Sequence, residues 1–555
     1  MKKKRRIDKN YFLLFLVTIV LISPLISKNY FIGHDTPYHI ANIDSLFQAI
    51  REVNFSKIIP IIANDFGYGS SIFYPKFPHY FTAFLTLFLS FFKNPIIYAV
   101  KLGNTVTILF SGILMYELCK NIFKNKNASL LSAIFYMTMP YFMADIYARG
   151  AYNESFIFLF MPLIFIGLIA LLQDKKRKFY ICFILGYIGL INSHLVLSVY
   201  FTIFTLLFIF VHIKSYLIRK RFFPLLLAAI IILITVLPTV IMLIEHQRLG
   251  IYGVFSENLM WSSRSTVSYK VLSWKDYIIP HIEFNGLCYF LCPIVLIFSL
   301  LGILKIRTER DENRKCILVG ILLFVIFSFL FGVCSFVYQI LPKLLLAIQF
   351  PSRNVSFTGF GLSILAGYGF LSIKESHWQI IQFLSIILCL ITALVCINFQ
   401  HFMPLDTSKN DPNTGMGFQK EYLTQNALDH IQYFEERDHN VRIVSGDKNL
   451  KIKVLKDKVP MFQFKVDKVD KDTILELPRL YYLGYDIQVQ SKDKTERVAY
   501  SLSKNGFINI KLSQSSVVTV DYKGTSLYCF FRTIRIIFYV VLIITLSLLR
   551  FKRRT

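Results

Sequence analysis

Residues 1–26 read MKKKRRIDKNYFLLFLVTIVLISPLI, and this stretch decides the class of the fold. A cluster of Lys and Arg is followed by an apolar run from Tyr11 to Ile26, which is long enough to cross a bilayer as a helix. Basic residues of this kind stay in the cytoplasm, so the span exits on the opposite side. No small-x-small cleavage site follows the run, which predicts an uncleaved signal anchor.

The apolar character of this first run recurs along most of the chain. Of its 555 residues, 55% are hydrophobic and 17% are charged, whereas a typical soluble globule has roughly 25% charged residues. The sequence predicts a polytopic α-helical membrane protein of about 12–13 spans. The predicted spans are 11–27, 95–118, 128–143, 155–172, 179–192, 195–212, 222–244, 286–304, 316–335, 354–373, 378–397 and 531–549.

Residues 79–92 form one more apolar stretch, but it is short. Alternation from a cytoplasmic N-terminus puts every basic loop inside only if this stretch does not cross the membrane fully. It is then a re-entrant or interfacial helix. If it does cross, another segment in the first third of the chain is assigned wrongly.

The formal net charge of +27 does not indicate nucleic-acid binding. Lys and Arg concentrate in short loops between the predicted spans and in the tail 550–554. This is the positive-inside pattern, which sets the topology of a membrane protein. It predicts that both termini are cytoplasmic and that residues 28–78, 144–154, 245–285 and 336–353 face outward.

The first outward segment carries a cluster of ionisable residues at Gly33-His34-Asp35-Thr36-Pro37-Tyr38-His39. A carboxylate between two histidines is a candidate general base, with His34 and His39 as candidate substrate-binding groups. The alternative is a helix N-cap, because Asp followed by Pro in the first turn is a common helix start. A cap does not need the two histidines.

Two more outward motifs contain residues that bind sugars or phosphates in other proteins. Tyr74 lies among Gly, aromatic and Pro residues, which suit either an aromatic belt at the membrane interface or stacking on a pyranose ring. The turn from Asp145 to Glu154 places Arg149 between two carboxylates. This arrangement predicts either a local ion-pair network or a site in which Arg149 holds a phosphate and a carboxylate holds a hydroxyl group or a metal.

Gln349-Phe350-Pro351-Ser352-Arg353 stands just before a predicted span, at the end that faces outward. The positive-inside rule disfavours Arg at that end. Arg353 is therefore a candidate anion-binding residue, and a snorkelling side chain is the alternative.

The hydrophilic stretch near the C-terminus differs from the predicted spans in its pattern of apolar residues. Short runs with period-two alternation between 441 and 522 predict a small all-β domain, with a helix over 421–436 before it. The predicted domains are 1–397 (membrane), 398–530 (extracytoplasmic, mainly β) and 531–555 (last span and basic tail). The nine cysteines lie in or beside spans, and Cys288 and Cys292 are predicted to be packing residues.

The order of these motifs resembles a known group of proteins. A Gly-His-Asp loop, an aromatic-Tyr-Pro segment, Ala148-Arg149-Gly150-Ala151…Glu154 and Gln-Phe-Pro-x-Arg353 follow one another as in the YfhO-like bacterial membrane proteins. That group carries the label pyruvoyl-tetrahydropterin-synthase-related membrane domain. The resemblance covers residues 28–165, 340–370 and 475–530. Ser352 departs from it, because relatives commonly have an aromatic residue there.

The YfhO-like group is similar to glycosyltransferases of the GT-C fold. The resemblance implies an enzyme of a bacterial cell membrane that takes a sugar from a polyprenyl-phosphate carrier at the outer face. It implies Asp35 as the catalytic base, a functional role for Glu154, and substrate contacts from Arg149 and Arg353. The implied acceptor is a cell-envelope glycan such as a teichoic acid.

The residues and the resemblance together predict an inverting glycosyltransferase. Asp35 takes the proton of an acceptor hydroxyl as the polyprenyl phosphate leaves, and an Arg balances the phosphate charge. A divalent metal, Mg or Mn, is left open because no metal triad is legible in the sequence. Two alternatives also stay open: a transporter of lipid-linked sugars or polymers, and a non-enzymatic factor of envelope assembly.

Overall fold

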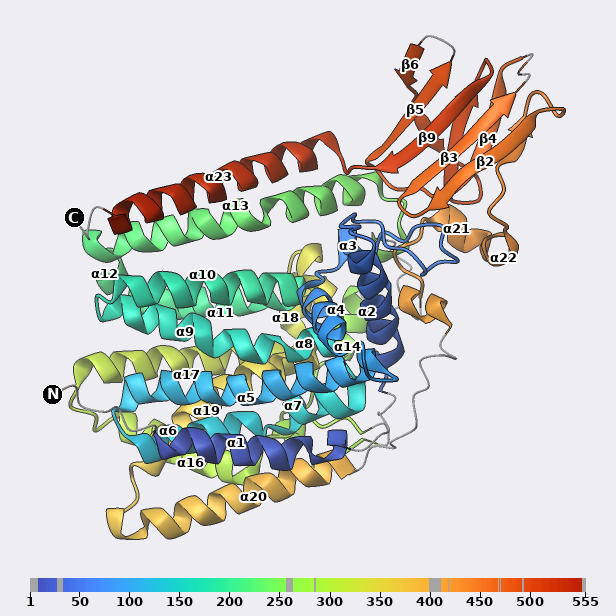
Figure 1. Cartoon of the computed structure of the whole chain (residues 1–555). Helices are drawn as coiled ribbons and strands as arrows, with labels where there is room; N and C mark the ends of the chain where they lie inside the picture. Colours follow the sequence, from blue (N-terminus) through green and yellow to red (C-terminus); the bar gives the residue numbers. More distant parts are fainter. Residues whose placement is uncertain are drawn as a thin grey trace. The chain divides into compact units, whose positions relative to one another are not determined.

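The computed structural model describes residues 8–26, 33–255, 263–283, 286–398, 411–417, 419–467, 469, 471–491 and 494–551. The chain forms two compact units (Figure 1). The first unit contains residues 1–39, 76–229 and 260–409, and the second contains 40–75, 230–259 and 410–555. α2 (Thr36–Arg51) and α13 (Arg219–Leu249) each begin in the first unit and continue in the second.

The described part of the first unit consists of helices joined by loops, with an isolated β-bridge that links Ile282 to Cys288. Its longer helices are α1 (Lys9–Ile22), α4 (Phe77–Phe88), α5 (Pro95–Phe123), α6 (Lys126–Met137), α9 (Ile157–Leu172), α10 (Lys176–Ser193), α11 (Leu195–Val211), α16 (Pro293–Ile306), α17 (Glu312–Val333), α19 (Asn354–Phe370) and α20 (Trp378–Asn398). Its short elements are η1 (Ser23–Ile26), α7 (Pro140–Ala144), η2 (Asp145–Arg149), α8 (Tyr152–Ser155), α12 (Ile213–Tyr216), α14 (Arg264–Tyr269), α15 (Trp274–Ile278), α18 (Ser335–Ile340), η4 (Lys343–Ile348), η5 (Pro351–Arg353) and η6 (Glu375–His377).

α19 lies at the centre of this unit. All of its residues are buried, and it packs against α16, α17 and α6. The contact with α16 is close because it is made through glycines: a Cβ on Gly302 would come within 2.1 Å of the Leu365 carbonyl oxygen, and one on Gly369 within 1.9 Å of the Phe298 carbonyl oxygen. A helix that is buried on all sides belongs to the core of a helical bundle.

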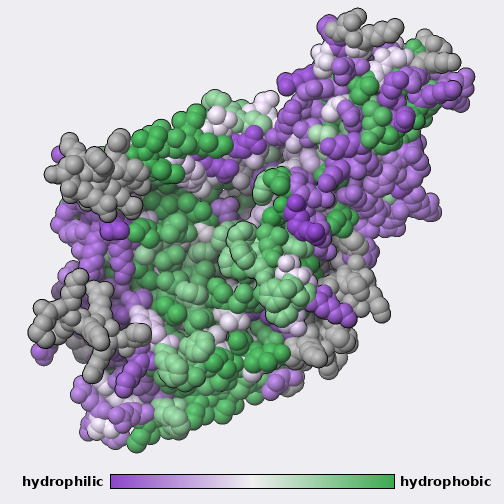
Figure 2. All heavy atoms as spheres, in the orientation of Figure 1, coloured by the Kyte–Doolittle hydropathy of each residue, from purple (hydrophilic) through white to green (hydrophobic). Residues whose placement is uncertain are grey.

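Seven helices in the described part of the chain are long and apolar enough to cross a membrane. They span 9–26, 95–123, 152–172, 219–249, 312–333, 375–398 and 526–544, and two shorter apolar helices are 195–211 and 293–306. Hydrophobic residues cover much of the helical surface seen in Figure 2. The predicted fold class, a polytopic α-helical membrane protein with a small all-β region near the C-terminus, is confirmed.

The short apolar stretch 79–92 corresponds mostly to α4, which has 12 residues. At 1.5 Å per residue the helix is about 18 Å long, less than the roughly 30 Å hydrocarbon core of a bilayer. α4 is also amphipathic, with polar side chains on its buried face and apolar side chains on its exposed face. His79, Thr82 and Thr86 are buried, whereas Phe84 and Phe88 are exposed.

The second unit contains the β-strands. They are β1 (Arg442–Ser445), β2 (Lys451–Lys458), β3 (Met461–Asp467), β4 (Thr473–Leu480), β5 (Tyr485–Ser491), β6 (Lys494–Arg497), β7 (Tyr500–Leu502), β8 (Phe507–Leu512) and β9 (Ser516–Tyr522). They form a four-stranded sheet in the order β1-β4-β8-β7 and a five-stranded sheet in the order β2-β3-β9-β5-β6. Every strand pair is antiparallel.

The alternating runs in the sequence correspond to seven of these strands, and β6 and β7 were not predicted. β6 (KTER) is exposed along its whole length and has no apolar alternation. The predicted helix over 421–436 is two short helices, α21 (Gln425–Asp429) and α22 (Ile431–Glu436). The unit also contains α3 (Ser70–Phe73), η3 (Gly253–Phe255), η8 (Pro412–Met416) and α23 (Ser526–Phe551).

Aromatic rings join distant parts of the sequence within the second unit. The ring of Phe73 stacks on that of Tyr422 at 5.3 Å, and the ring of Tyr252 stacks on that of Tyr482 at 5.7 Å. All four side chains are buried. These contacts bring residues 40–75 and 230–259, which the sequence-based division assigned to the membrane domain, into one unit with the β-strands.

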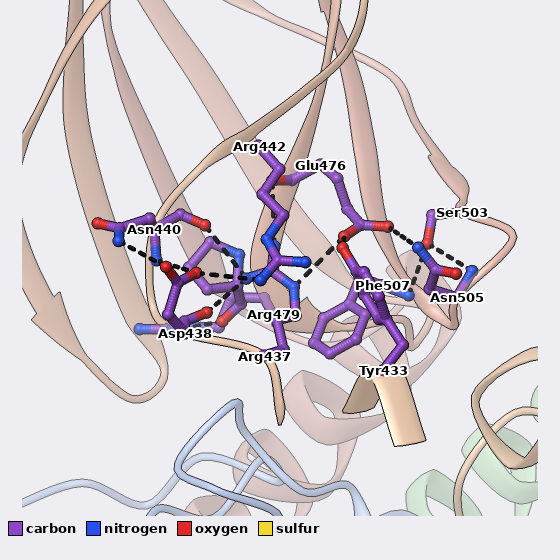
Figure 3. Close-up of polar contacts among 11 residues, drawn as sticks. Tyr433, Arg437, Asp438, Asn440, Arg442, Glu476, Arg479, Ser503, Asn505 and Phe507 are labelled. Atoms are coloured by element: carbon purple, nitrogen blue, oxygen red, sulfur yellow. Dashed lines mark hydrogen bonds and ion pairs between the residues drawn. The ribbon is translucent and has the colours of Figure 1, made fainter. Parts of the chain in front are cut away.

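A buried ion pair also holds this unit together (Figure 3). Arg437 Nε lies 3.3 Å from Glu476 Oε1, and neither side chain is more than 2% exposed. Glu476 also accepts hydrogen bonds from the hydroxyl of Tyr433 and from Asn505 Nδ2, the latter at 3.2 Å. The guanidinium of Arg437 stands 4.5 Å from the centroid of the Phe507 ring. The pair is thus enclosed and hydrogen-bonded, the condition under which a buried pair is tolerated.

Glu476→Gln is expected to destabilise the second unit by about 3 kcal/mol, because it leaves the Arg437 guanidinium buried without its counter-charge. Faster hydrogen exchange in peptides that cover β4 and β8 would report the change. The matched control is Glu496→Gln, since the Glu496 side chain is 50% exposed and its ion pair with Lys494 is on the surface. Equal exchange in the two variants would contradict the structural role of the buried pair.

Candidate active site

The loop that carries Asp35 is fixed against a second segment of the first unit. The backbone N–H of Asp35 donates to the carbonyl oxygen of Arg149 at 2.7 Å. A Cβ on Gly33 would come within 2.6 Å of the Ala148 carbonyl oxygen, so only glycine allows this approach. Thr36 Oγ1 accepts from the Gly33 N–H at 3.0 Å and closes the turn at the start of α2. The Asp35 side chain is 47% exposed.

The partner segment is a π-helix, η2, that runs from Asp145 to Arg149. π-helical turns are rare in proteins, and those that occur often lie at functional sites. Gly150 ends the turn with φ +62°, a backbone conformation that favours glycine. A Cβ there would also come within 2.0 Å of Thr36 Oγ1. The two loops therefore depend on each other for their conformation.

Five charged residues meet at this junction, and we call them the charged cluster: Asp35, Asp145, Arg149, Glu154 and Arg353. Arg149 Nη1 lies 2.7 Å from Asp145 Oδ1 and 2.9 Å from Glu154 Oε2. Arg149 Nη2 lies 3.9 Å from Asp35 Oδ2. Arg353 Nε lies 3.2 Å from Glu154 Oε2. Glu154 is thus shared by two guanidinium groups, and Arg149 by three carboxylates.

Most of the charged cluster is removed from solvent. The side chain of Asp145 is 0% exposed and that of Glu154 is 2% exposed, whereas Asp35 is half-exposed. With all groups ionised, three carboxylates face two guanidinium groups, a formal charge of −1. Burial, and then the negative charge of Glu154, raise the pKa of Asp145 well above its usual range, although Arg149 opposes the shift. Glu154 and Asp145 raise the pKa of Arg149, against the effect of its burial.

The hydrogen bonds in the cluster are incomplete. The hydroxyl of Tyr141 donates to Glu154 Oε1 at 2.8 Å. Asp145 Oδ2 is buried without a hydrogen-bond partner among the described residues, whereas Glu154 Oε2 lies 2.9 Å from Arg149 Nη1 and 3.2 Å from Arg353 Nε. Buried polar atoms are usually satisfied in native proteins, and exceptions occur at functional sites.

Arg353 comes from the Gln-Phe-Pro-Ser-Arg motif. Gln349 has φ +61°, which is strained for a residue other than glycine. η5 follows this position, and Arg353 Nη1 donates to the Ile348 carbonyl oxygen at 2.8 Å. The guanidinium of Arg353 therefore points toward Glu154. A snorkelling side chain would instead extend outward to solvent.

Histidines lie beside the charged cluster. Nδ1 of His39 lies 2.7 Å from Nε2 of His79, and both rings are buried. Burial, and then the charges of Lys76 and Arg149, hold the pKa of His39 well below its usual range, so its ring is uncharged at neutral pH. His194 caps α11 and is also buried, and burial followed by the charge of Arg353 lowers its pKa to about 3.

The structure thus brings together four of the seven residues singled out from the sequence: Asp35, Arg149, Glu154 and Arg353. His39 is buried next to His79, and His34 is exposed to solvent. Tyr74 is half-buried and belongs to the second unit. The catalytic and substrate-binding roles assigned to these residues stay predictions.

Sequence reasoning did not select Tyr141 and His79. Tyr141 stands in an apolar stretch, where an aromatic residue is more often part of the core. His79 lies at the end of the aromatic and Pro-rich segment around Tyr74, but only Tyr74 was selected from that segment. For Asp145 the sequence predicts, as an alternative to Glu154, a role in holding a hydroxyl group or a metal, and it predicts no role for His194.

No group of three or more His, Cys, Asp and Glu side chains in the described part of the chain is arranged as a metal site. In the charged cluster the guanidinium groups pair with Asp145 Oδ1 and Glu154 Oε2. A role for Mg or Mn stays a prediction.

Part of the chain is similar to a known family of enzymes. Residues 76–242 match the family model of dolichyl-phosphate-mannose-protein mannosyltransferase. Asp145, Arg149 and Glu154 lie within the matched stretch, and Asp35 and Arg353 lie outside it. An uncharacterized protein of Lactococcus lactis subsp. cremoris (strain MG1363) is 21% identical over 560 residues, which cover 90% of this chain and 88% of the relative. The finer resemblance to the YfhO-like group stays a prediction.

Three solved structures are similar to this chain over part of their length. ArnT from Cupriavidus metallidurans bound to undecaprenyl phosphate is 13% identical, with a TM-score of 0.40, and the match covers 68% of this chain and 63% of that one. The oligosaccharyltransferase of Archaeoglobus fulgidus is 9% identical (TM-score 0.43; 78% and 58% covered). The arabinosyltransferase EmbB of Mycobacterium smegmatis is 9% identical (TM-score 0.35; 94% and 63% covered). The chain thus matches less than two thirds of the length of each solved structure.

Proposed function

We propose that this protein is a membrane glycosyltransferase that transfers a sugar from a polyprenyl-phosphate carrier to a cell-envelope acceptor. One observation carries the proposal: a half-exposed carboxylate, Asp35, stands 3.9 Å from a guanidinium that is itself held by buried carboxylates. The reaction needs a base to take the proton of the acceptor hydroxyl and a cation to balance the charge of the leaving phosphate, and both kinds of group are present in this cluster. The match of residues 76–242 to a family that uses dolichyl phosphate mannose supports the donor class.

The proposed reaction is a single displacement. The oxygen of an acceptor hydroxyl forms a bond to the anomeric carbon of the sugar while the bond from that carbon to the phosphate oxygen breaks. Asp35 takes the proton of the hydroxyl, and the polyprenyl phosphate leaves with the electron pair. Attack from the face opposite the phosphate inverts the anomeric configuration.

The two guanidinium groups would stabilise the leaving phosphate. Arg149 and Arg353 converge on Glu154, so both are fixed before a substrate arrives, and preorganised charges of this kind lower a transition-state barrier. In this proposal Glu154 acts through the two arginines and not on the substrate directly. No step is routed through a metal.

The proposed location of the site follows from the distribution of basic loops. If the positive-inside rule holds for this chain, the charged cluster and the β-strands are extracytoplasmic and both termini are cytoplasmic. The acceptor is then a glycan of the cell envelope. A teichoic-acid-like polymer is the acceptor that the sequence resemblance implies.

The test is turnover by the purified protein. Synthetic polyprenyl-phosphate hexose and N-acetylhexosamine are supplied with a crude envelope acceptor, and release of polyprenyl phosphate and transfer of sugar are measured. Transfer from either donor supports the proposal. Consumption of neither donor, together with movement of a lipid-linked sugar across a vesicle membrane that contains the protein, would overturn it in favour of a transporter.

A further inference from the structure

The buried face of α4 carries three polar side chains, those of His79, Thr82 and Thr86, and two of them have partners outside the helix. Nε2 of His79 lies 2.7 Å from Nδ1 of His39 in α2. Thr82 Oγ1 lies 2.6 Å from the hydroxyl of Tyr152 in α8. Burying a polar side chain lowers stability unless the side chain finds a partner, and these two contacts supply partners from outside α4.

Both partners stand next to members of the charged cluster. The N–H of His39 donates to the carbonyl oxygen of Asp35 at 3.0 Å, so His39 belongs to the first turn after Asp35. Tyr152 stands two residues before Glu154 in α8. α4 therefore contacts both the turn that presents the candidate base and the helix that holds the two arginines.

The contact at α2 rests on His79 in particular. Two uncharged imidazoles at this distance share one proton, one ring donating and the other accepting. Nδ1 of His79 is buried and has no hydrogen-bond partner among the described residues. Within that part of the chain, the ring of His79 therefore makes one hydrogen bond, to His39. Lys76, at the N-terminus of α4, adds a second contact by donating to the hydroxyl of Tyr38 at 3.3 Å.

We propose that His79 is a positioning residue for the transfer reaction, acting through its hydrogen bond to His39 to hold Asp35 at the distance from Arg149 that the reaction needs. This inference rests on the proposed function and adds to it a residue that does not touch substrate. A displacement of about 1 Å in a reacting group is enough to lower a rate by as much as 100-fold.

The test compares two substitutions of His79 that differ in one hydrogen bond. His79→Leu removes the bond, and His79→Gln places an amide nitrogen near the position of Nε2. The expected result is a fall in kcat of about 10- to 100-fold for His79→Leu, an unchanged KM for the donor, and recovery of most of kcat in His79→Gln. Equal loss in both, or a change in KM alone, would overturn the proposal.

Two matched controls separate positioning from general packing. His212 is a buried histidine whose Nδ1 bonds to the Phe208 carbonyl within its own helix, and Thr86 is a buried residue of α4 whose hydroxyl bonds to Thr82 in the same helix. His212→Gln and Thr86→Val are expected to keep the wild-type kcat. If Thr86→Val lowers kcat as much as His79→Leu does, the effect belongs to α4 packing and the proposal is wrong.

Hydrogen exchange of the intact protein gives a readout that does not depend on turnover. Peptides that cover residues 33–45 are expected to exchange faster in His79→Leu than in the wild type, and at the wild-type rate in His79→Gln and His212→Gln. If the wild-type protein transfers no sugar, the proposed function fails while this measurement still decides whether His79 holds the Asp35 turn. Unchanged exchange in His79→Leu would refute the positioning role even in an active enzyme.

Discussion

Asp35→Asn is expected to reduce the rate of sugar transfer by about 10²- to 10⁴-fold, the usual contribution of a general base. The substitution keeps the size of the side chain and removes its ability to accept a proton at neutral pH. The turn itself should survive, because it is held by the backbone bond from Asp35 to Arg149 and by the bond from Gly33 to Thr36. The loss should appear in kcat, measured as release of polyprenyl phosphate.

The matched control for this prediction is Asp174→Asn. Asp174 is another aspartate of the first unit with surface ion pairs, 2.7 Å to Lys220 and 2.9 Å to Arg221, and its side chain is 40% exposed. Its loss is expected to leave the rate within a factor of two, because surface pairs contribute little. Equal rates for Asp35→Asn and the wild type would show that the base is elsewhere, with Asp145 or Glu154 as the next candidates.

The helical part of the fold could be predicted because its signal is local. A run of apolar residues of membrane length specifies a helix whatever it packs against, so the spans near Pro95–Phe123 and Glu312–Val333 were found within a few residues. The alternating runs of the β-strands are local in the same way. β6 lacked this signal because a fully exposed edge strand needs no apolar face.

The composition of the second unit could not be predicted, because it depends on contacts between residues far apart in the chain. Phe73 and Tyr252 stand in outward segments of the predicted membrane domain, and their partners Tyr422 and Tyr482 are more than 150 residues away. In a sequence, an aromatic residue near a span indicates an aromatic belt at the membrane interface. Only the stacked geometry shows that these rings are core.

Part of the candidate site could be predicted because charged residues are unusual at the outer ends of membrane spans. Arg353 is a candidate because arginine is disfavoured at an outward end of a span, and Arg149 and Glu154 because ionisable residues at the rim of a bundle are costly. Asp35 is a candidate because it is a carboxylate between two histidines. Their meeting was implied by the order of motifs and not by any spacing. His79 could not be found, since its role depends on the 2.7 Å contact with His39 across two helices.

Glu154→Ala is expected to destabilise the protein by about 3–5 kcal/mol, the cost of leaving a buried charge without its partner. Arg149 keeps Asp145 at 2.7 Å, but Arg353 loses the one ion pair that the described residues give it. Thermal unfolding in detergent, followed by intrinsic fluorescence, should show a midpoint lowered by several degrees. Glu312→Gln is the control, because the side chain of Glu312 is 81% exposed and its loss should not move the midpoint.

A second substitution distinguishes an unpaired charge from lost packing. If the instability of Glu154→Ala comes from the isolated guanidinium, adding Arg353→Met should restore part of the midpoint, because an apolar side chain of similar length can occupy the buried position without a counter-charge. If it comes from the cavity left by the carboxylate, the double variant should be less stable than either single one. The same double variant should transfer no sugar in either case, since the arginine that the proposed reaction uses is gone; full activity would show that Arg353 serves stability alone.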